Sequence, residues 1–138
     1  MQPIRFDFSV QEAFERIVRG LASQGWKPSL KPRGKDSFVN ACAYRGEDGR
    51  KCAVGWLIPD DVASEWDSKP KPALRSRIEA GDVEPADDRL IEFLLTAQRA
   101  HDDFSEGPAD LRCRFISIGD DWKLVWPSDV PTSGQIQA

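Results

Sequence analysis

The fold prediction starts from residues 42–60, which read Cys42-Ala-Tyr-Arg-Gly-Glu-Asp-Gly-Arg-Lys-Cys52-Ala-Val-Gly-Trp-Leu-Ile-Pro-Asp60. Asp48-Gly49 supplies the positive φ that a tight β-hairpin turn needs. A three-residue turn with a glycine bulge pairs Tyr44 with Cys52 and places on one face Cys42, Tyr44, Cys52 and Val54. A two-residue turn puts the two thiols on opposite faces, because a shift of one residue inverts every side chain. The stretch predicts a β-hairpin, and its register decides whether the thiols share a face.

Two helices are predicted to pack against this hairpin. Ser9 and Glu12 have the form of a capping box, and apolar residues then recur at helical spacing over 10–24. Residues 86–104 carry the longest apolar stripe, which includes His101, the only histidine. Residues 3–8 and 122–126 alternate apolar and polar side chains, as strands with one buried face do. These patterns predict an α+β fold, in which a small, mainly antiparallel sheet containing the 39–57 hairpin packs against helices 10–24 and 86–104.

Shorter helices are predicted beside these elements. Pro59-Asp60-Asp61 is typical of a helix start, because proline suits the first turn and acids favour the helix N-terminus. Another helix is expected over 73–80, and a third from Pro108 to Gly119, although residues 111–118 are also prone to form a strand. The 138 residues are long enough for one core. We expect a single globular domain over 1–127 and a flexible tail over 128–138.

Composition and charge exclude several classes of function. A net charge of −4 and a pI near 5.0 argue against nucleic-acid binding, in spite of basic clusters around residues 31–35 and 69–77. The sequence has no apolar run of the roughly 18 residues that a membrane span requires and no signal-peptide pattern, so we expect a cytoplasmic protein without a membrane partner. Three cysteines in a reducing compartment argue against a disulfide framework.

The cysteines and the histidine allow three interpretations. Zinc prefers sulfur and imidazole ligands, and the candidate set for one ion is Cys42, Cys52, His101 and Cys113. These residues lack the close pairing that zinc ligands usually show, such as Cys-x-x-Cys. In the second interpretation Cys52 or Cys42 is a nucleophile and His101 its base. A regular helix, however, points Asp102 about 100° away from His101, which argues against Asp102 as the residue that orients the imidazole. In the third, the thiols and the imidazole are packed core groups.

The motif in residues 42–60 resembles a family of small bacterial and phage or prophage proteins without an assigned function. They share the pattern Cys-x-Tyr-Arg-Gly-x-Asp-Gly-x-Lys-Cys-Ala-x-Gly-x-Leu-Ile-Pro-Asp, which this chain matches from Cys42 to Asp60. The resemblance covers about the first half of the chain. It implies a phage or mobile-element context and a small cytoplasmic protein, but it implies no reaction and no catalytic residue.

These observations predict a non-enzymatic module that binds and modulates a macromolecular partner, most simply a protein, and that needs no cofactor. The alternative is a thiol- or zinc-dependent enzyme that uses Cys42 or Cys52 with His101. The sequence gives no signal of oligomeric state. Partner-binding candidates are basic residues of the 27–51 region and two tryptophans, namely Lys31, Arg33, Lys35, Trp56 and Trp66.

Overall fold

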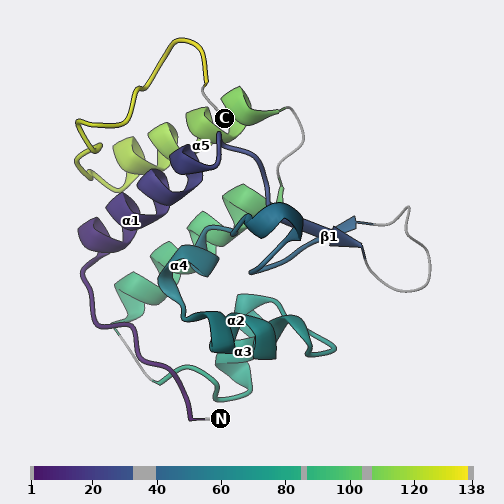
Figure 1. Cartoon of the computed structure of the whole chain (residues 1–138). Coiled ribbons are helices and arrows are strands. Elements are labelled where there is room, and N and C mark those ends of the chain that lie inside the picture. Colours follow the sequence, from purple (N-terminus) through teal and green to yellow (C-terminus); the bar gives the residue numbers. More distant parts are fainter. Residues whose placement is uncertain (1, 33–39, 85–86, 104–106, 137–138) are drawn as a thin grey trace.

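Helices provide most of the regular structure of this chain (Figure 1). The computed structural model describes residues 2–32, 40–84, 87–103 and 107–136. In these residues the helices are α1 (Val10–Ser23), α2 (Asp60–Asp67), α3 (Leu74–Glu79), α4 (Asp88–Asp102) and α5 (Pro108–Asp121). Between α1 and α2 lie the short strands β1 (Leu30–Pro32) and β2 (Asn40–Cys42) and the 3₁₀ turns η1 (Glu47–Gly49) and η2 (Val54–Leu57).

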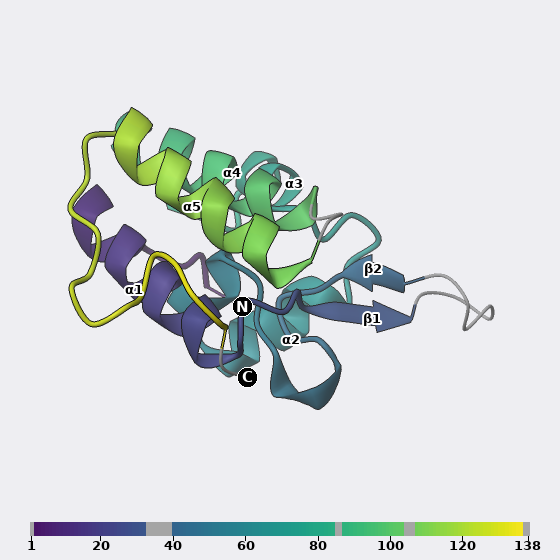
Figure 2. The same cartoon turned by 90° about the horizontal axis from the view of Figure 1, so that it is seen from above.

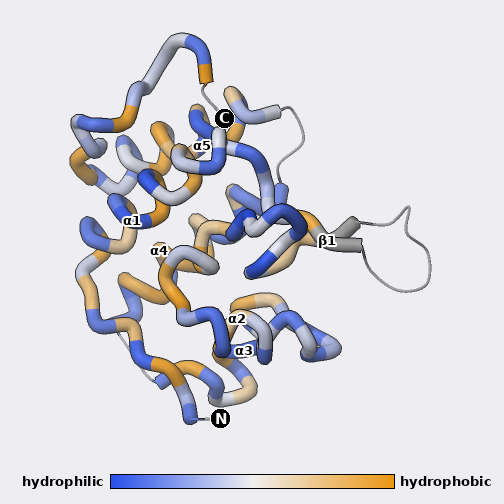
Figure 3. The backbone as a smooth tube through the Cα atoms, viewed as in Figure 1, coloured by the Kyte–Doolittle hydropathy of each residue, from blue (hydrophilic) through white to orange (hydrophobic). Residues whose placement is uncertain are grey.

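The core lies where α1, α4 and α5 pack against one another, and the view from above shows these three helices side by side (Figure 2). Phe14 of α1 is fully buried and meets the rings of Phe93 and Trp126 edge to face, with centroids 6.3 Å and 5.9 Å away. α5 comes close to α1 at Gly119, where a Cβ atom would lie 2.9 Å from Cζ of Phe14. Apolar and polar positions alternate along the helices, as expected for helices with one buried side (Figure 3).

The structure confirms the predicted helices. Ser9 and Glu12 form the capping box of α1, and Pro59 and Pro108 stand at the starts of α2 and α5. α1 ends in a Schellman-type cap, in which Gly25 has a φ of 70° and the N–H of Trp26 donates to the carbonyl of Leu21. Residues 111–118 are helical, because the spacing of their apolar residues buries one side of α5 despite the strand propensity of the individual residues.

The α+β prediction is wrong. In the described residues the only strands are β1 and β2, which have three residues each and pair antiparallel with Leu30 opposite Cys42. They form a two-stranded ribbon at one side of the helices, not a sheet that packs against them (Figure 1). The core is therefore helical.

The β-hairpin predicted over 39–57 does not form in the described part of that range, residues 40–57. A single bridge between Arg45 and Lys51 has the register expected of a three-residue turn, and the chain then enters η2 instead of a second strand. The backbone N–H groups that a partner strand would bind are used elsewhere. Those of Tyr44 and Arg45 donate to the Asp67 carboxylate at 3.0 Å each, and that of Ala43 donates to Ser29.

Two further predicted strands do not form. Residues 3–8 make one parallel bridge, between Ile4 and Val83. Residues 122–126 begin at Trp122, the C-terminal cap of α5, and both backbone groups of Val125 are bound by the side-chain amide of Gln11, at 2.8 and 2.9 Å. A side chain thus takes the place that a neighbouring strand would have.

The segment after α5 returns along α1 and α5 (Figure 1). Asp129 forms an ion pair with Arg19 at 3.2 Å, and Trp126 donates its indole N–H to the carbonyl of the buried Val130. The flexibility of residues 128–138 stays a prediction. None of the described helices combines the length and the apolar character needed to cross a lipid bilayer.

Candidate functional site

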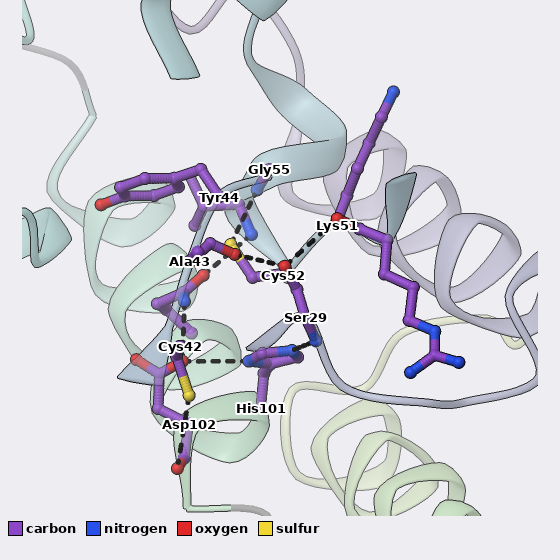
Figure 4. Close-up of polar contacts among 12 residues, drawn as sticks. Ser29, Cys42, Ala43, Tyr44, Lys51, Cys52, Gly55, His101 and Asp102 are labelled. Carbon is purple, nitrogen blue, oxygen red and sulfur yellow. Dashed lines mark hydrogen bonds and ion pairs between the residues drawn. The ribbon is translucent and has the colours of Figure 1, made fainter. Parts of the chain in front are cut away.

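The end of α4 and strand β2 bring three chemically capable side chains together (Figure 4). Cys42 Sγ, a ring nitrogen of His101 and a carboxylate oxygen of Asp102 all lie within 4.8 Å of one another. His101 is fully buried, Cys42 is half-buried and Asp102 is exposed. The cluster therefore runs from the core to the surface, and we call these three residues the Cys42 cluster.

Hydrogen bonds select the tautomer of His101. The backbone N–H of Ser29 donates to Nε2 over 3.0 Å, so Nε2 must present its lone pair. The proton of the neutral ring is then on Nδ1, which lies 3.0 Å from Oδ1 of Asp102 and donates to it. Both ring nitrogens are engaged within the protein, and neither is free to take a proton from a thiol.

The argument that Asp102 cannot orient His101 is wrong. Asp102 is the last residue of α4, and its carboxylate turns back to reach the imidazole while also accepting from Nε2 of Gln98 at 2.9 Å. The 100° separation applies to the directions of the Cα–Cβ bonds. It does not exclude contact between an aspartate carboxylate and Nδ1, the ring nitrogen nearest the backbone.

The thiol of Cys42 is held in its protonated form. Its Sγ lies 3.9 Å from the backbone carbonyl oxygen of Asp102 and donates to it. Burial raises the pKa of Cys42 to about 12, and the negative charges of Asp102 and Asp103 add to this effect. The thiolate is the nucleophilic form of cysteine, so this environment opposes nucleophilic chemistry at neutral pH.

The other two cysteines lie apart from this cluster. Cys52 is fully buried, its Sγ accepts the N–H of Gly55 at 3.3 Å, and burial raises its pKa. Cys113 is exposed on α5. Within the described residues, the proposed zinc set of Cys42, Cys52, His101 and Cys113 is thus not assembled around one point.

Arg45 explains much of the 42–60 motif. Its guanidinium donates from Nη1 to the carbonyl of Gly55 at 2.7 Å and from Nη2 to the carbonyl of Ile58 at 2.9 Å, and it pairs with the Asp60 carboxylate at 2.8 Å. One side chain thereby fixes η2 and the start of α2 to the turn at 46–49. Lys51 lies with Nζ 4.7 Å from the centre of the Trp56 ring. The motif thus encodes a structural unit in which the guanidinium of Arg45 finds its partners within residues 42–60.

Two motif glycines allow close backbone approach. A Cβ atom on Gly46 would lie 2.6 Å from Oγ of Ser29, and one on Gly55 would lie 2.6 Å from the carbonyl oxygen of Tyr44. These distances are shorter than van der Waals contact. They require glycine for packing and do not indicate a phosphate-binding loop.

Ser29 is the central residue that sequence reasoning missed. It is fully buried, and its hydroxyl donates to the carbonyl of Ala43 at 2.6 Å and reaches that of Arg50 at 3.1 Å. Its N–H binds His101 (Figure 4). A serine between Pro28 and Leu30 carries no sequence signal for this role, because its partners come from three distant segments.

The surface beside the Cys42 cluster is hollowed. A small cavity of about 40 Å³ is lined by Cys42, Tyr44 and Pro72, among others, and a larger one of about 250 Å³ lies between α3 and α4. The two cavities share the side chains of Ala73, Leu74, Gln98 and Asp102. The larger, which we call the α3–α4 hollow, is completed by Arg75, Leu95, Arg99 and Asp103.

The two tryptophans predicted to bind a partner do not line this surface. Trp66 is buried at 1% exposure, and the half-buried Trp56 ring packs on Gly20 of α1. Lys31 belongs to β1, whereas Arg33 and Lys35 lie outside the described residues. The exposed Arg75 and Arg99 gave no sequence signal beyond general charge.

No protein-family model matches this chain, and no curated protein or solved structure is significantly similar to it.

Proposed function

We propose that the protein acts without catalysis, by binding a protein partner at the α3–α4 hollow. The observation that carries this proposal is a set of exposed charges that have no ion-pair partner in the part of the chain that the structure describes. Arg75, Arg99 and Asp103 line the hollow, and none of them forms an ion pair with another of the described residues. Leu95 gives the hollow a partly apolar wall.

The Cys42 cluster supports a binding role over a catalytic one. The imidazole of His101 is engaged at both nitrogens, and the Cys42 thiol has a raised pKa. An imidazole whose two nitrogens are both hydrogen-bonded to other groups and a thiol that stays protonated do not make a nucleophilic pair. The cluster instead holds the end of α4 against β2, which positions Asp102 at the edge of the hollow.

The charges define the chemistry of the partner. A protein segment that fits here carries an acidic side chain opposite Arg75 and Arg99, a basic one opposite Asp102 and Asp103, and an apolar residue against Leu95. Complementary charges of this kind favour orientation and rapid association. The resemblance of the 42–60 motif to phage and prophage proteins suggests that the partner belongs to a host or defence system.

The test places a photo-crosslinking amino acid at Ala73, at the exposed rim of the hollow, in the native host. The cross-linked partner is then purified and its affinity measured by calorimetry. Arg75→Glu with Arg99→Glu should weaken binding at least tenfold, since like charges across an interface are repulsive. Lys123→Glu, an exposed cation at the far end of α5, is the matched control and should bind like the wild type. Equal affinity of the double variant would refute the proposal.

A metal site at the Cys42 cluster is the second candidate, favoured by the 4.8 Å grouping of sulfur, imidazole and carboxylate, all of which are zinc ligands. Against it, a metal at Nδ1 of His101 displaces the ring proton, while the Ser29 N–H already occupies Nε2. Titration with Co²⁺ distinguishes the two functions. A thiolate-to-cobalt absorption band that Cys42→Ser abolishes would favour the metal site, and its absence would favour the binding module.

A further inference from the structure

Arg112 of α5 is a buried cation with no counter-ion among the described residues. Its exposure is 7%, and its Nη2 donates to the carbonyl of Gly134 at 2.9 Å. Its Nε is buried and has no hydrogen-bond partner. Among the described residues no carboxylate lies within ion-pair distance of this guanidinium, which has five N–H donors to satisfy.

This arrangement differs from that of the other buried arginine in the described chain. Arg77 is 9% exposed, and it pairs with Asp82 at 2.6 Å and donates to the carbonyl of Lys71. Arg114, two residues after Arg112 on α5, pairs with Asp110 at 2.9 Å. Buried charges are costly unless an opposite charge or enough hydrogen bonds compensate them. Arg112 lacks that compensation from the described residues.

Arg112 also borders a cavity. A hollow of about 100 Å³ lies between α1, the turn that follows it, α5 and the C-terminal segment, which crosses α1 in Figure 2. Its remaining walls are the side chains of Ala22, Trp26, Pro131, Gln135 and Ile136. One cation and one amide are thus set in surroundings that are otherwise apolar.

We propose that this hollow is a binding site for a small monocarboxylate with a short apolar body. A planar carboxylate matches the donor geometry of a guanidinium and carries one charge, equal to that of Arg112. A phosphate brings more charge than the single cation can balance. The apolar part of the ligand would lie against Trp26 and Ile136. This site is on a different part of the molecule from the α3–α4 hollow, and its proposal does not rest on the proposed function.

The experiment titrates the full chain with butyrate and follows the indole N–H resonance of Trp26 and the thermal unfolding temperature. We expect saturable changes with a Kd on the order of millimolar, because so small a ligand buries little surface. 1-Butanol, which has the same chain without the charge, and inorganic phosphate should bind at least tenfold more weakly, with chloride as the control for ionic strength. Equal binding of 1-butanol or phosphate would overturn the carboxylate assignment, as would a response to butyrate that does not saturate.

Two variants locate the site, and a third serves as their control. Arg112→Met should abolish the saturable response, whereas Arg114→Met, on the same helix, should keep it. Ala22→Leu fills part of the hollow and leaves Arg112 in place, so it should weaken butyrate binding at least tenfold even if Arg112→Met does not fold. Unchanged butyrate affinity in Ala22→Leu, or in a folded Arg112→Met protein, would show that the ligand binds elsewhere.

Discussion

The backbone N–H of Ser29 donates to Nε2 of His101 over 3.0 Å, between residues that are 72 positions apart in the chain. Both residues are fully buried. The bond joins the start of β1 to the end of α4, and because it fixes the ring tautomer it also directs Nδ1 to Asp102. A single contact therefore links the strand pair, the longest helix and the surface carboxylate of the candidate site.

Replacement of His101 tests this bond. Gln places an acceptor near the position of Nε2, whereas Met has similar length and no comparable acceptor. We expect His101→Met to be less stable than His101→Gln by about 1–3 kcal/mol, since the Ser29 N–H would be left buried and unsatisfied. Urea denaturation at neutral pH measures the difference. A Met variant as stable as the Gln variant would mean that the bond between Ser29 and His101 contributes nothing to the unfolding free energy.

Substitution of Arg45 tests whether the motif is held by its carbonyl contacts. Arg45→Lys keeps the charge but cannot reach Gly55, Ile58 and Asp60 together. We expect a loss of about 2 kcal/mol in unfolding free energy, as for hydrogen bonds to charged groups. Asp60→Asn is the matched control and should cost measurably less, because Asp60 is exposed and its ion pair is screened by solvent. Chemical denaturation of both variants measures the two losses of unfolding free energy. A larger loss in Asp60→Asn than in Arg45→Lys would show that the ion pair contributes more than the carbonyl contacts.

At Gly20 we expect a Gly→Ala substitution to have the opposite effect on stability from the one it has in an exposed helix. In an exposed helix Gly→Ala stabilises by about 1 kcal/mol. Here the new Cβ atom would lie 2.2 Å from Cδ2 of Trp56, so we expect Gly20→Ala to destabilise the protein by about 1–3 kcal/mol through overpacking. In a Trp56→Leu background the same change should become stabilising. Thermal or urea unfolding of the wild type, the two single variants and the double variant gives a double-mutant cycle. If the two substitutions change the unfolding free energy additively, the contact between Gly20 and Trp56 would be contradicted.

The three thiols should differ widely in reactivity. For a pKa of about 12, the thiolate fraction of Cys42 at pH 8 is on the order of 10⁻⁴, so alkylation of Cys42 should be far slower than that of the exposed Cys113. Asp103→Asn removes one of the charges that raise this pKa and should accelerate alkylation of Cys42 while leaving Cys113 unchanged. Mass spectrometry of the labelled peptides gives both rates. A Cys42 that reacts as fast as Cys113 would revive the nucleophile hypothesis.

The same shift predicts a loss of stability at alkaline pH. The folded state favours the protonated thiol of Cys42, whose pKa rises from an ordinary 9.0 to about 12. Its contribution is therefore complete below pH 9 and is lost as the pH rises from there towards 12. Burial raises the pKa values of Cys52 and Tyr44 in the same direction. Cys42→Ala should flatten part of the decline in unfolding free energy between pH 7 and pH 10.5, and Cys113→Ala should not.

Helix periodicity was readable from the sequence because its causes are local. The Ser9–Glu12 capping box, the prolines at helix starts and the apolar spacing of residues 86–104 all act within one or two turns. The helices predicted from them are the helices observed, with ends that differ by a few residues. The tight turn at 46–49 was likewise predictable, because Asp48 and Gly49 take the positive φ values of 61° and 74°.

The strands were predicted wrongly because alternation of apolar residues does not reveal which partner binds the backbone. Residues 43–45 were predicted to be a strand because they precede the Asp48-Gly49 turn, but Ser29 and Asp67 bind their N–H groups. At Val125 the partner is the side chain of Gln11. Either kind of partner satisfies the backbone, and only the tertiary structure selects one.

The candidate site also has features that the sequence predicts and features that only the tertiary structure decides. By itself, the sequence determined the helices, the turn and the residue types available for chemistry, because propensity, capping and periodicity depend on near neighbours. The tertiary structure alone decided that Cys42 meets His101 and Asp102 while Cys52 and Cys113 do not, and that Arg112 is buried with no carboxylate of the described residues beside it. These outcomes depend on contacts between segments far apart in the chain, whose geometry is fixed only when the core packs.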